Sequence, residues 1–474
     1  MVFSSALFLL YFFPIFFLVY YSIPFSLKNI FLLLVSVLFF TWGAPVFTIV
    51  ALSSILVDFF IVRQLFHSSG KQKKLLLFIS VFFNLALLAY FKYANFFVDN
   101  ISQFASVWGA SGISGWTKVI LPVGISFFTF KKISYCFDVY RNTHAPFTKI
   151  TDYALFILLF PELVAGPIVR FNEIADQITD RRDQETIDNK LLGLFRFIIG
   201  LSKKVLIANV LGAEVTKIFD SNIIELSTPI AWLGILAYTF QIYFDFSGYS
   251  DMAIGLAKMM GFTFPENFDN PYTSQSITEF WRRWHITLGR WMRDYLYIPL
   301  GGNKKSTFRS YLNLIIVFFL SGLWHGASWN FVIWGCFHGF FLIADRVFLL
   351  KFYSKIGKIP SIIITFFIVM LGWVLFRTDD LSDARDYFYK LFCFDFSPNK
   401  FYFLNDFFVL LILAFVFSFA GIAKPFVRLQ QTILFDHYSN KKTIVLGVFY
   451  FVLLFISVSS IIGSGFNPFI YYRF

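Results

Sequence analysis

The sequence predicts an all-helical protein that crosses a membrane many times, and three observations support this prediction. Of the 474 residues, 58% are hydrophobic and 14% are charged, and the mean hydropathy is +0.69. A soluble protein of this size cannot bury so much apolar surface. The apolar residues form runs of about 20, enough to span the hydrocarbon core of a bilayer as a helix. The basic residues form short clusters between these runs, as expected of cytoplasmic loops.

The net charge of +12 comes from these loop clusters. We expect them to face anionic lipid, and we do not expect nucleic-acid binding. The three cysteines, Cys136, Cys336 and Cys393, show neither a CxxC pattern nor a Cys/His metal spacing. The sequence therefore supports neither a disulfide framework nor a zinc site.

The apolar runs predict about eleven membrane-spanning helices. The first run is too long and too uniformly apolar for the core of a signal peptide. We see no repeat, soluble domain or long linker, and we expect one integral-membrane domain over residues 1–474. The expected spans are at about 3–21, 29–42, 46–66, 75–91, 191–212, 229–246, 311–325, 328–350, 360–376, 404–423 and 443–463.

The distribution of basic residues predicts the orientation of the chain. Arg63 and three lysines at 71–74 flank the third span, whereas a loop expected over 94–117 contains no basic residue. Because basic loops stay in the cytoplasm, both termini are expected on the outer side of the membrane.

Two apolar stretches are interrupted by proline, glycine and charged residues. Residues 121–141 begin with Leu-Pro-Val-Gly and end with two lysines, an aspartate and an arginine, and residues 151–168 place Glu162 between two prolines. Broken, charged helices face a protein interior or a water-filled cavity rather than lipid. The following stretch, 170–190, is predicted to be a cytoplasmic loop with an amphipathic surface helix.

The span at 229–246 runs into a polar stretch that contains Gln241, Asp245, Ser247 and Asp251. One interpretation is a helix terminus, with Asp245 or Ser247 capping the next helix. The other is a polar wall of a substrate cavity.

Residues 276–302 combine tryptophan, including Trp281, with arginine and His285. This stretch is too polar to span lipid and suits a helix at the interface, or one that dips into a protein-walled funnel. Its arginines would bind either the phosphates of an acyl donor or lipid head groups; they are Arg282, Arg283, Arg290 and Arg293.

An apolar helix is predicted to end at His325 in the stretch Ser-Gly-Leu-Trp-His-Gly-Ala-Ser-Trp-Asn over 321–330, where another helix begins at once. An imidazole at membrane depth can exchange a proton near neutral pH and is a functional candidate. The alternative is a histidine that only hydrogen-bonds a neighbouring helix. Gly322 and Gly326 would let another backbone or a ligand approach this face, and His338 is expected to be a packing residue.

The signatures of serine hydrolases, nucleotide-binding proteins and zinc peptidases are absent from this sequence. A histidine without a serine nucleophile or a metal partner suits general-base catalysis on an incoming hydroxyl, which contributes about 10²–10⁴-fold. Acyl transfer from a thioester to an alcohol needs such a base. The last nine residues, 466–474, are aromatic and follow a Gly-Ser-Gly joint. They are either an interfacial anchor or a peptide that folds back toward the catalytic centre.

Six blocks, in order along nearly the whole chain, resemble the membrane-bound O-acyltransferase family. Within it they are most similar to the alginate O-acetyltransferase branch, close to the membrane components of peptidoglycan O-acetyltransferases. The blocks are 1–5, 121–130, 163–168, 280–285, 293–302 and 321–330.

The resemblance implies a ring of helices around a tunnel in the bacterial plasma (inner) membrane. It implies that His325 is the catalytic histidine and that His285 is a second catalytic or donor-positioning residue. The donor, with acetyl-CoA expected, would enter from the cytoplasm, and no bound cofactor is expected. The expected substrate and tunnel residues are Trp324, Asp245, Gln241, Trp281 and Asn330.

The tail resembles the ending of the small partner in teichoic acid D-alanylation. The resemblance implies that Tyr471, or alternatively Tyr472, carries the acyl group. The acyl group would then pass to an extracytoplasmic SGNH-type O-acetyltransferase or a related envelope protein. Phenol ionises near pH 10, so it needs a base such as His325 to act as a nucleophile.

Two alternatives remain open at this point. One is D-alanyl transfer to teichoic acid. The other is a transporter in which Glu162, Asp245 and Asp251 couple transport to ion movement, although no internal repeat is visible.

Overall fold

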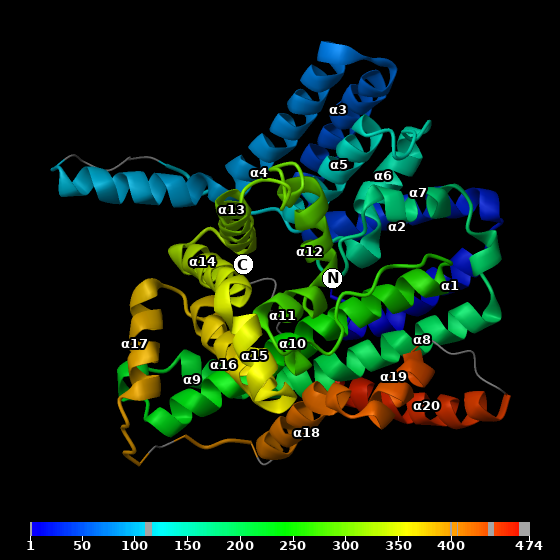
Figure 1. Cartoon of the computed structure of the whole chain (residues 1–474). Helices are drawn as coiled ribbons and strands as arrows, with labels where there is room; N and C mark the ends of the chain where they lie inside the picture. Colours follow the sequence, from blue (N-terminus) through cyan, green and yellow to red (C-terminus); the bar gives the residue numbers. More distant parts are fainter. Residues whose placement is uncertain (1, 110–115, 399–400, 405, 435–439, 464–474) are drawn as a thin grey trace. The chain divides into compact units, whose positions relative to one another are not determined.

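Helices are the only regular elements in the part of the chain that the structure, a computed structural model, describes (Figure 1). The described residues are 2–109, 116–398, 401–404, 406–434 and 440–463. In these ranges seven helices are long and apolar enough to cross a membrane, or eight if one bent pair counts as a single span. The prediction of an all-helical, polytopic membrane protein is confirmed.

Eight of the eleven expected spans coincide with these helices. The other three, at 3–21, 191–212 and 229–246, also fold as helices. The last two of these carry charged residues that pair inside the protein, which lowers their hydropathy.

Contacts divide the chain into two units, the first made of residues 12–185 and 261–264, and the second of most of the remaining chain. We describe each unit separately, and the single domain over 1–474 stays a prediction. The helices of the first unit are α1 (Phe13–Ser22), α2 (Phe25–Gly43), α3 (Phe47–His67), α4 (Gly70–Val107), α5 (Ile125–Tyr140), α6 (Ile150–Leu158) and α7 (Phe171–Thr179).

Helix α4 is longer than the sequence led us to expect. The expected loop at 94–117 is wrong over its first part, because the helix continues to Val107. Residues 94–107 contain neither glycine nor proline, so nothing in the chain stops the helix there. The amphipathic helix expected within 170–190 is present as α7, which buries Phe171 and Ile174.

The interrupted segments of the first unit face its interior, as predicted. Gly124 opens α5 with a φ of 78°, and a Cβ there would lie 2.4 Å from the carbonyl oxygen of Leu163. Lys131 of α5 forms a buried ion pair with Glu162 at 2.6 Å.

A second buried polar group in the first unit surrounds Asp58 of α3. Its carboxylate accepts hydrogen bonds from Ser80 (2.6 Å), Asn84 (2.9 Å) and Tyr153 (2.6 Å). These bonds join α3 to α4 and α6, so the carboxylate serves as a shared acceptor for side chains of two neighbouring helices of this unit.

The second unit is organised around the long helix α10 (Thr228–Met259), which packs along α8 (Ile187–Ser202) and α9 (Asn209–Phe219). Backbones of α8 and α10 approach closely, since a Cβ on Gly200 would lie 2.5 Å from the carbonyl oxygen of Gly248. The remaining helices are α11 (Ile277–Arg283), α12 (Ile286–Met292), α13 (Thr307–His325), α14 (Trp329–Ala344), α15 (Leu350–Ile356), α16 (Lys358–Arg377), α17 (Leu381–Phe392), α18 (Phe407–Phe419), α19 (Lys424–Leu434) and α20 (Asn440–Gly463).

The helix α10 runs without a break through 241–251, so the interpretation of Asp245 or Ser247 as a helix cap is wrong. Asp245 pairs with Lys204 at 2.6 Å, and Asp251 pairs with Arg196 at 2.6 Å and with Lys203 at 2.7 Å. These cations stabilise the carboxylates inside the helix packing, which lets an apolar helix continue through two acidic residues.

The first residues of the chain belong to this second unit. Phe3 is fully buried and stacks on Tyr249 of α10, with ring centroids 4.7 Å apart. Phe8 is also fully buried, and its ring centroid lies 6.3 Å from that of Phe197 of α8.

Candidate active site

Helices α13 and α14 follow one another in the chain (Figure 1). His325 is the last residue of α13. The chain turns through Gly326, and α14 begins at Trp329, as predicted. A Cβ on Gly322 would lie 2.2 Å from the carbonyl oxygen of Phe331. The expected close backbone approach at this glycine is therefore made by α14.

Aromatic rings surround the imidazole of His325, which is only 8% exposed. The ring centroids of Trp324, Trp334 and Phe376 lie 4.9, 5.1 and 5.3 Å away, and all three rings meet the imidazole edge to face. Such packing fixes the plane of the ring and excludes water. It leaves the side chain suited to proton transfer with a substrate group rather than with solvent.

His285 lies in the break between α11 and α12, where its backbone adopts a left-handed conformation with a φ of 46° and a ψ of 52°. This conformation is uncommon for a residue with a side chain and aims the imidazole into the protein. The ring is 1% exposed and meets Phe246 edge to face at 4.7 Å. The ring centroid of Trp324 lies 6.1 Å from that of His285. The structure therefore brings His285, Trp324 and His325 together.

Sequence reasoning missed Asn267, which holds His285. The Oδ1 atom of Asn267 lies 3.1 Å from Nδ1 of His285, and it also accepts hydrogen bonds from Thr287. Asn267 lies in an irregular segment with no motif, so no sequence signal could have identified it. Burial lowers the pKa of His285 to about 3, and the imidazole is therefore neutral at physiological pH.

The other predicted site residues take different positions. Trp281 joins the aromatic wall, with its ring 5.6 Å from that of Trp334. Asn330 instead donates hydrogen bonds to the backbone and hydroxyl oxygens of Thr378 at 2.9 and 3.2 Å, at the end of α16.

Two more predicted residues come from α10. Asp245 is engaged by Lys204, and the amide of Gln241 lies against Gly212 of α9. His338 is fully buried among aromatic rings, including Trp281 and Trp334 at 5.1 Å each. Its contacts agree with the packing role expected for it.

The arginines of 276–302 are mostly directed to the surface. Arg283 pairs with Glu279 at 2.8 Å and Arg293 with Asp294 at 2.7 Å, while Arg282 and Arg290 are exposed.

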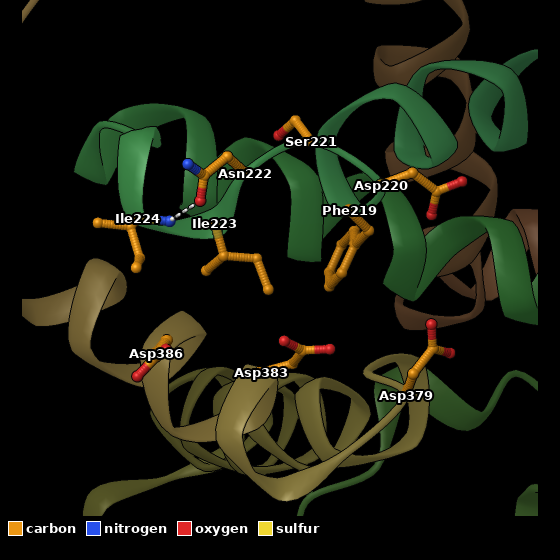
Figure 2. A pocket seen from close by; sticks show the side chains of 9 residues that line it. All are labelled: Phe219, Asp220, Ser221, Asn222, Ile223, Ile224, Asp379, Asp383 and Asp386. Carbon is orange, nitrogen blue, oxygen red and sulfur yellow. Dashed lines mark hydrogen bonds between the residues drawn. The ribbon is translucent and has the colours of Figure 1, made fainter.

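A separate acidic pocket of about 440 Å³ lies between α17 and the turn after α9 (Figure 2). Figure 2 shows Asp379, Asp383 and Asp386 on one side and the segment 219–224 on the other. Neither histidine of the site lines this pocket. Across the described ranges, no group of three or more His, Cys, Asp or Glu side chains could hold a metal ion.

The aromatic tail, with Tyr471 and Tyr472, lies outside the described residues. What the described part offers is one buried imidazole at a helix end, a second imidazole with a fixed hydrogen-bond partner, and an indole between them. Such a pair can bind and deprotonate a hydroxyl in a site from which water is excluded.

Comparisons with known proteins agree with this chemistry. The model of the membrane-bound O-acyltransferase family matches residues 72–357. The probable alginate O-acetylase AlgI of Pseudomonas aeruginosa is 43% identical over 398 residues, covering 83% of this chain and 75% of that protein. The peptidoglycan O-acetyltransferase of Helicobacter pylori is 38% identical over 418 residues, covering 81% and 78%. The teichoic acid D-alanyltransferase of Bacillus subtilis is 30% identical over 279 residues, covering 55% and 69%.

Proposed function

The chain belongs to the membrane-bound O-acyltransferase family, and from this premise we propose that it moves acetyl groups across the membrane for O-acetylation of a cell-envelope polysaccharide. It is a multi-pass membrane protein and an O-acyltransferase. The donor is a cytoplasmic thioester, acetyl-CoA, and the membrane is the bacterial plasma (inner) membrane. Both chain termini lie on the outer side, which follows from the basic loops.

The observation that carries this proposal is the position of His325, buried at the end of α13 within an aromatic shell. His325 accepts the proton of the attacking hydroxyl. The hydroxyl oxygen then bonds to the thioester carbonyl carbon, the C–S bond breaks, and the proton leaves on the thiol. Exclusion of water protects the thioester from hydrolysis before the acceptor is in place.

The first acceptor is the phenol of Tyr471, with Tyr472 as the competing choice. A tyrosine is a weak nucleophile at neutral pH and needs an adjacent base. The acyl-tyrosine then delivers the acetyl group to an extracytoplasmic SGNH-type O-acetyltransferase or a related envelope protein. If this step does not exist, the tail is an anchor and the acetyl group passes directly to another acceptor.

The acceptor polymer is alginate-like exopolysaccharide or peptidoglycan. The names of the two relatives with identities of 43% and 38% support this choice. D-alanyl transfer to teichoic acid is the second candidate, supported by the match to the more distant D-alanyltransferase.

The transporter alternative is set aside because the family is one of acyltransferases. Its three coupling carboxylates are also all engaged by cations in the described structure. Glu162 pairs with Lys131, Asp245 with Lys204, and Asp251 with Arg196.

Intact-mass spectrometry of the purified protein after incubation with acetyl-CoA tests the proposal, with peptide mapping of 466–474. We expect one added acetyl group on Tyr471, absent from His325→Ala and from Tyr471→Phe. His144→Ala, in the first unit, is the control for the loss of another histidine. Near-normal acetyl transfer by His325→Ala would disprove the role of this base. An unmodified tail with continued thioester consumption would remove only the carrier step.

A further inference from the structure

The contacts of Asn267 determine which nitrogen of His285 carries its proton. Asn267 is 1% exposed and touches three side chains of the second unit. Its Oδ1 atom lies 3.3 Å from the backbone nitrogen of Thr287, 2.9 Å from the Thr287 hydroxyl and 3.1 Å from Nδ1 of His285. Its Nδ2 atom lies 3.1 Å from the hydroxyl of Ser250.

The backbone N–H of Thr287 fixes the orientation of this amide. A backbone N–H only donates, so the atom of Asn267 that faces it must be the oxygen. The opposite orientation would place the amide N–H₂ group against another donor. The hydroxyl of Ser250, which can accept, receives the amide N–H on the other side.

The same oxygen faces Nδ1 of His285, and a neutral imidazole has one donor and one acceptor nitrogen. Because Oδ1 of Asn267 can only accept, Nδ1 must be the donor. The hydrogen bond at one ring nitrogen sets the protonation of the other.

We propose that Asn267 is a positioning residue that holds His285 as the Nδ1–H tautomer, so that Nε2 offers a lone pair to a hydrogen-bond donor of the substrate. This inference rests on the proposed acyl transfer for its substrate. The donor group is an amide N–H in the arm of the thioester, because the single proton of the acyl-accepting hydroxyl goes to His325. His285 in this tautomer is unable to donate from Nε2 to the thioester carbonyl, so it does not stabilise the oxyanion through that atom.

Several features keep this tautomer in place. Asn267 and His285 are each 1% exposed, so water does not compete for the hydrogen bond. The left-handed backbone of His285 brings Thr287, two residues later, onto the same oxygen. Phe246 packs against the imidazole with ring centroids 4.7 Å apart, which opposes a flip of the ring.

The first measurement is nitrogen NMR of the protein in lipid, labelled at its six histidines. The variant His285→Gln identifies the signals of His285 by their loss. In the unsubstituted protein we expect Nδ1 protonated and Nε2 unprotonated at neutral pH. A protonated Nε2, or protons on both nitrogens, would overturn the proposal without any need for a variant.

Three variants then test the role of Asn267. Asn267→Leu removes the acceptor, and Asn267→Asp keeps it, with Ser250 able to donate to the second carboxylate oxygen. Thr287→Val removes one hydroxyl donor to Asn267 but leaves the His285 contact, and serves as the matched control. We expect a changed tautomer population in Asn267→Leu only.

Thioester turnover tests the assignment of the substrate donor. We expect a rise in KM for acetyl-CoA at constant kcat in Asn267→Leu, because the amide of the donor arm loses its acceptor. A fall in kcat of about tenfold or more at constant KM would overturn the proposal, since it would give His285 the role of the base, which contributes about 10²–10⁴-fold. Recovery in Asn267→Asp supports the assignment, because a purely apolar packing role would not be restored by a carboxylate.

Unchanged kinetics in Asn267→Leu, despite a changed tautomer, would overturn the proposal. Absence of turnover in the unsubstituted protein would instead contradict the proposed function. The tautomer of His285 would still be measurable in that protein, so the two failures are distinguishable.

Discussion

Breaking the buried ion pair between Lys204 and Asp245 is expected to destabilise the second unit strongly. Their charged atoms lie 2.6 Å apart, and each side chain is only 2% exposed. Lys204→Met leaves the carboxylate of Asp245 without its cation in an environment that water does not reach. Asp245→Asn leaves the ammonium group of Lys204 in the same position.

Loss of one partner of a buried pair costs about 3–5 kcal/mol, because the remaining charge keeps its desolvation penalty. Whole domains are stable by only about 5–15 kcal/mol, so each single variant loses a large share of its stability. Removing both charges in Lys204→Met/Asp245→Leu is expected to be neutral or stabilising, since both desolvation penalties disappear together. Lys203→Met is the matched control. Its side chain is 27% exposed, and its partner Asp251 keeps Arg196.

Thermal unfolding in detergent and thioester turnover are measured on the same samples. The unfolding temperature should fall in both single variants, recover in the double variant and change little in Lys203→Met. Turnover that recovers with stability would make Asp245 a structural residue. Turnover that stays low in the stable double variant would support the tunnel-wall role predicted for Asp245. Single variants as stable as the parent protein, or a double variant as unstable as either, would refute the reasoning.

Two further predictions concern a helix hairpin and a helix cap. Gly322→Ala should separate α13 from α14 and abolish turnover, because its Cβ would lie 2.2 Å from the backbone oxygen of Phe331. Gly339→Ala is the tolerated control, since its Cβ would meet only the end of a side chain, at 3.1 Å. Unchanged thermal stability in Gly322→Ala would contradict this account. Asp380 caps α17 by accepting the backbone N–H of Asp383 at 2.9 Å, so Asp380→Ala should cost about 1 kcal/mol and Asp380→Asn much less. The hydroxyl of Ser382 and this N–H hold the pKa of Asp380 below its usual value, so the stabilisation exists above the unfolded pKa and is lost as the pH falls through the folded pKa. Unfolding curves of Asp380→Ala and the parent protein should therefore converge in acid, and a difference that grows in acid would reverse the sign.

The sequence predicted those features that depend on neighbours along the chain. The end of α13 at His325 and the start of α14 at Trp329 follow from apolar length and from glycine. The burial of Glu162 was predictable because this acidic residue lies inside an apolar run of the sequence. The family motifs marked Trp324 and His285, and the structure places the Trp324 ring near the imidazoles of both His285 and His325.

Contacts between distant parts of the chain were not predictable in this way. Asp245 pairs with Lys204, and Asn330 binds Thr378, although no periodicity links either pair. Asn267 belongs to a stretch without regular structure. Its role follows only from the folded arrangement that brings Thr287 and His285 to one oxygen atom.

The burial of Phe3 against Tyr249 has a consequence for how the protein is made. The ribosome adds 245 residues after Phe3 before it reaches the stacking partner, Tyr249. Through that interval the membrane-insertion machinery must handle the segment around Phe3 before it has reached its final contacts. Settling of this segment is thus a late step of biogenesis, and a tag fused directly before it would be carried into the packing around α10.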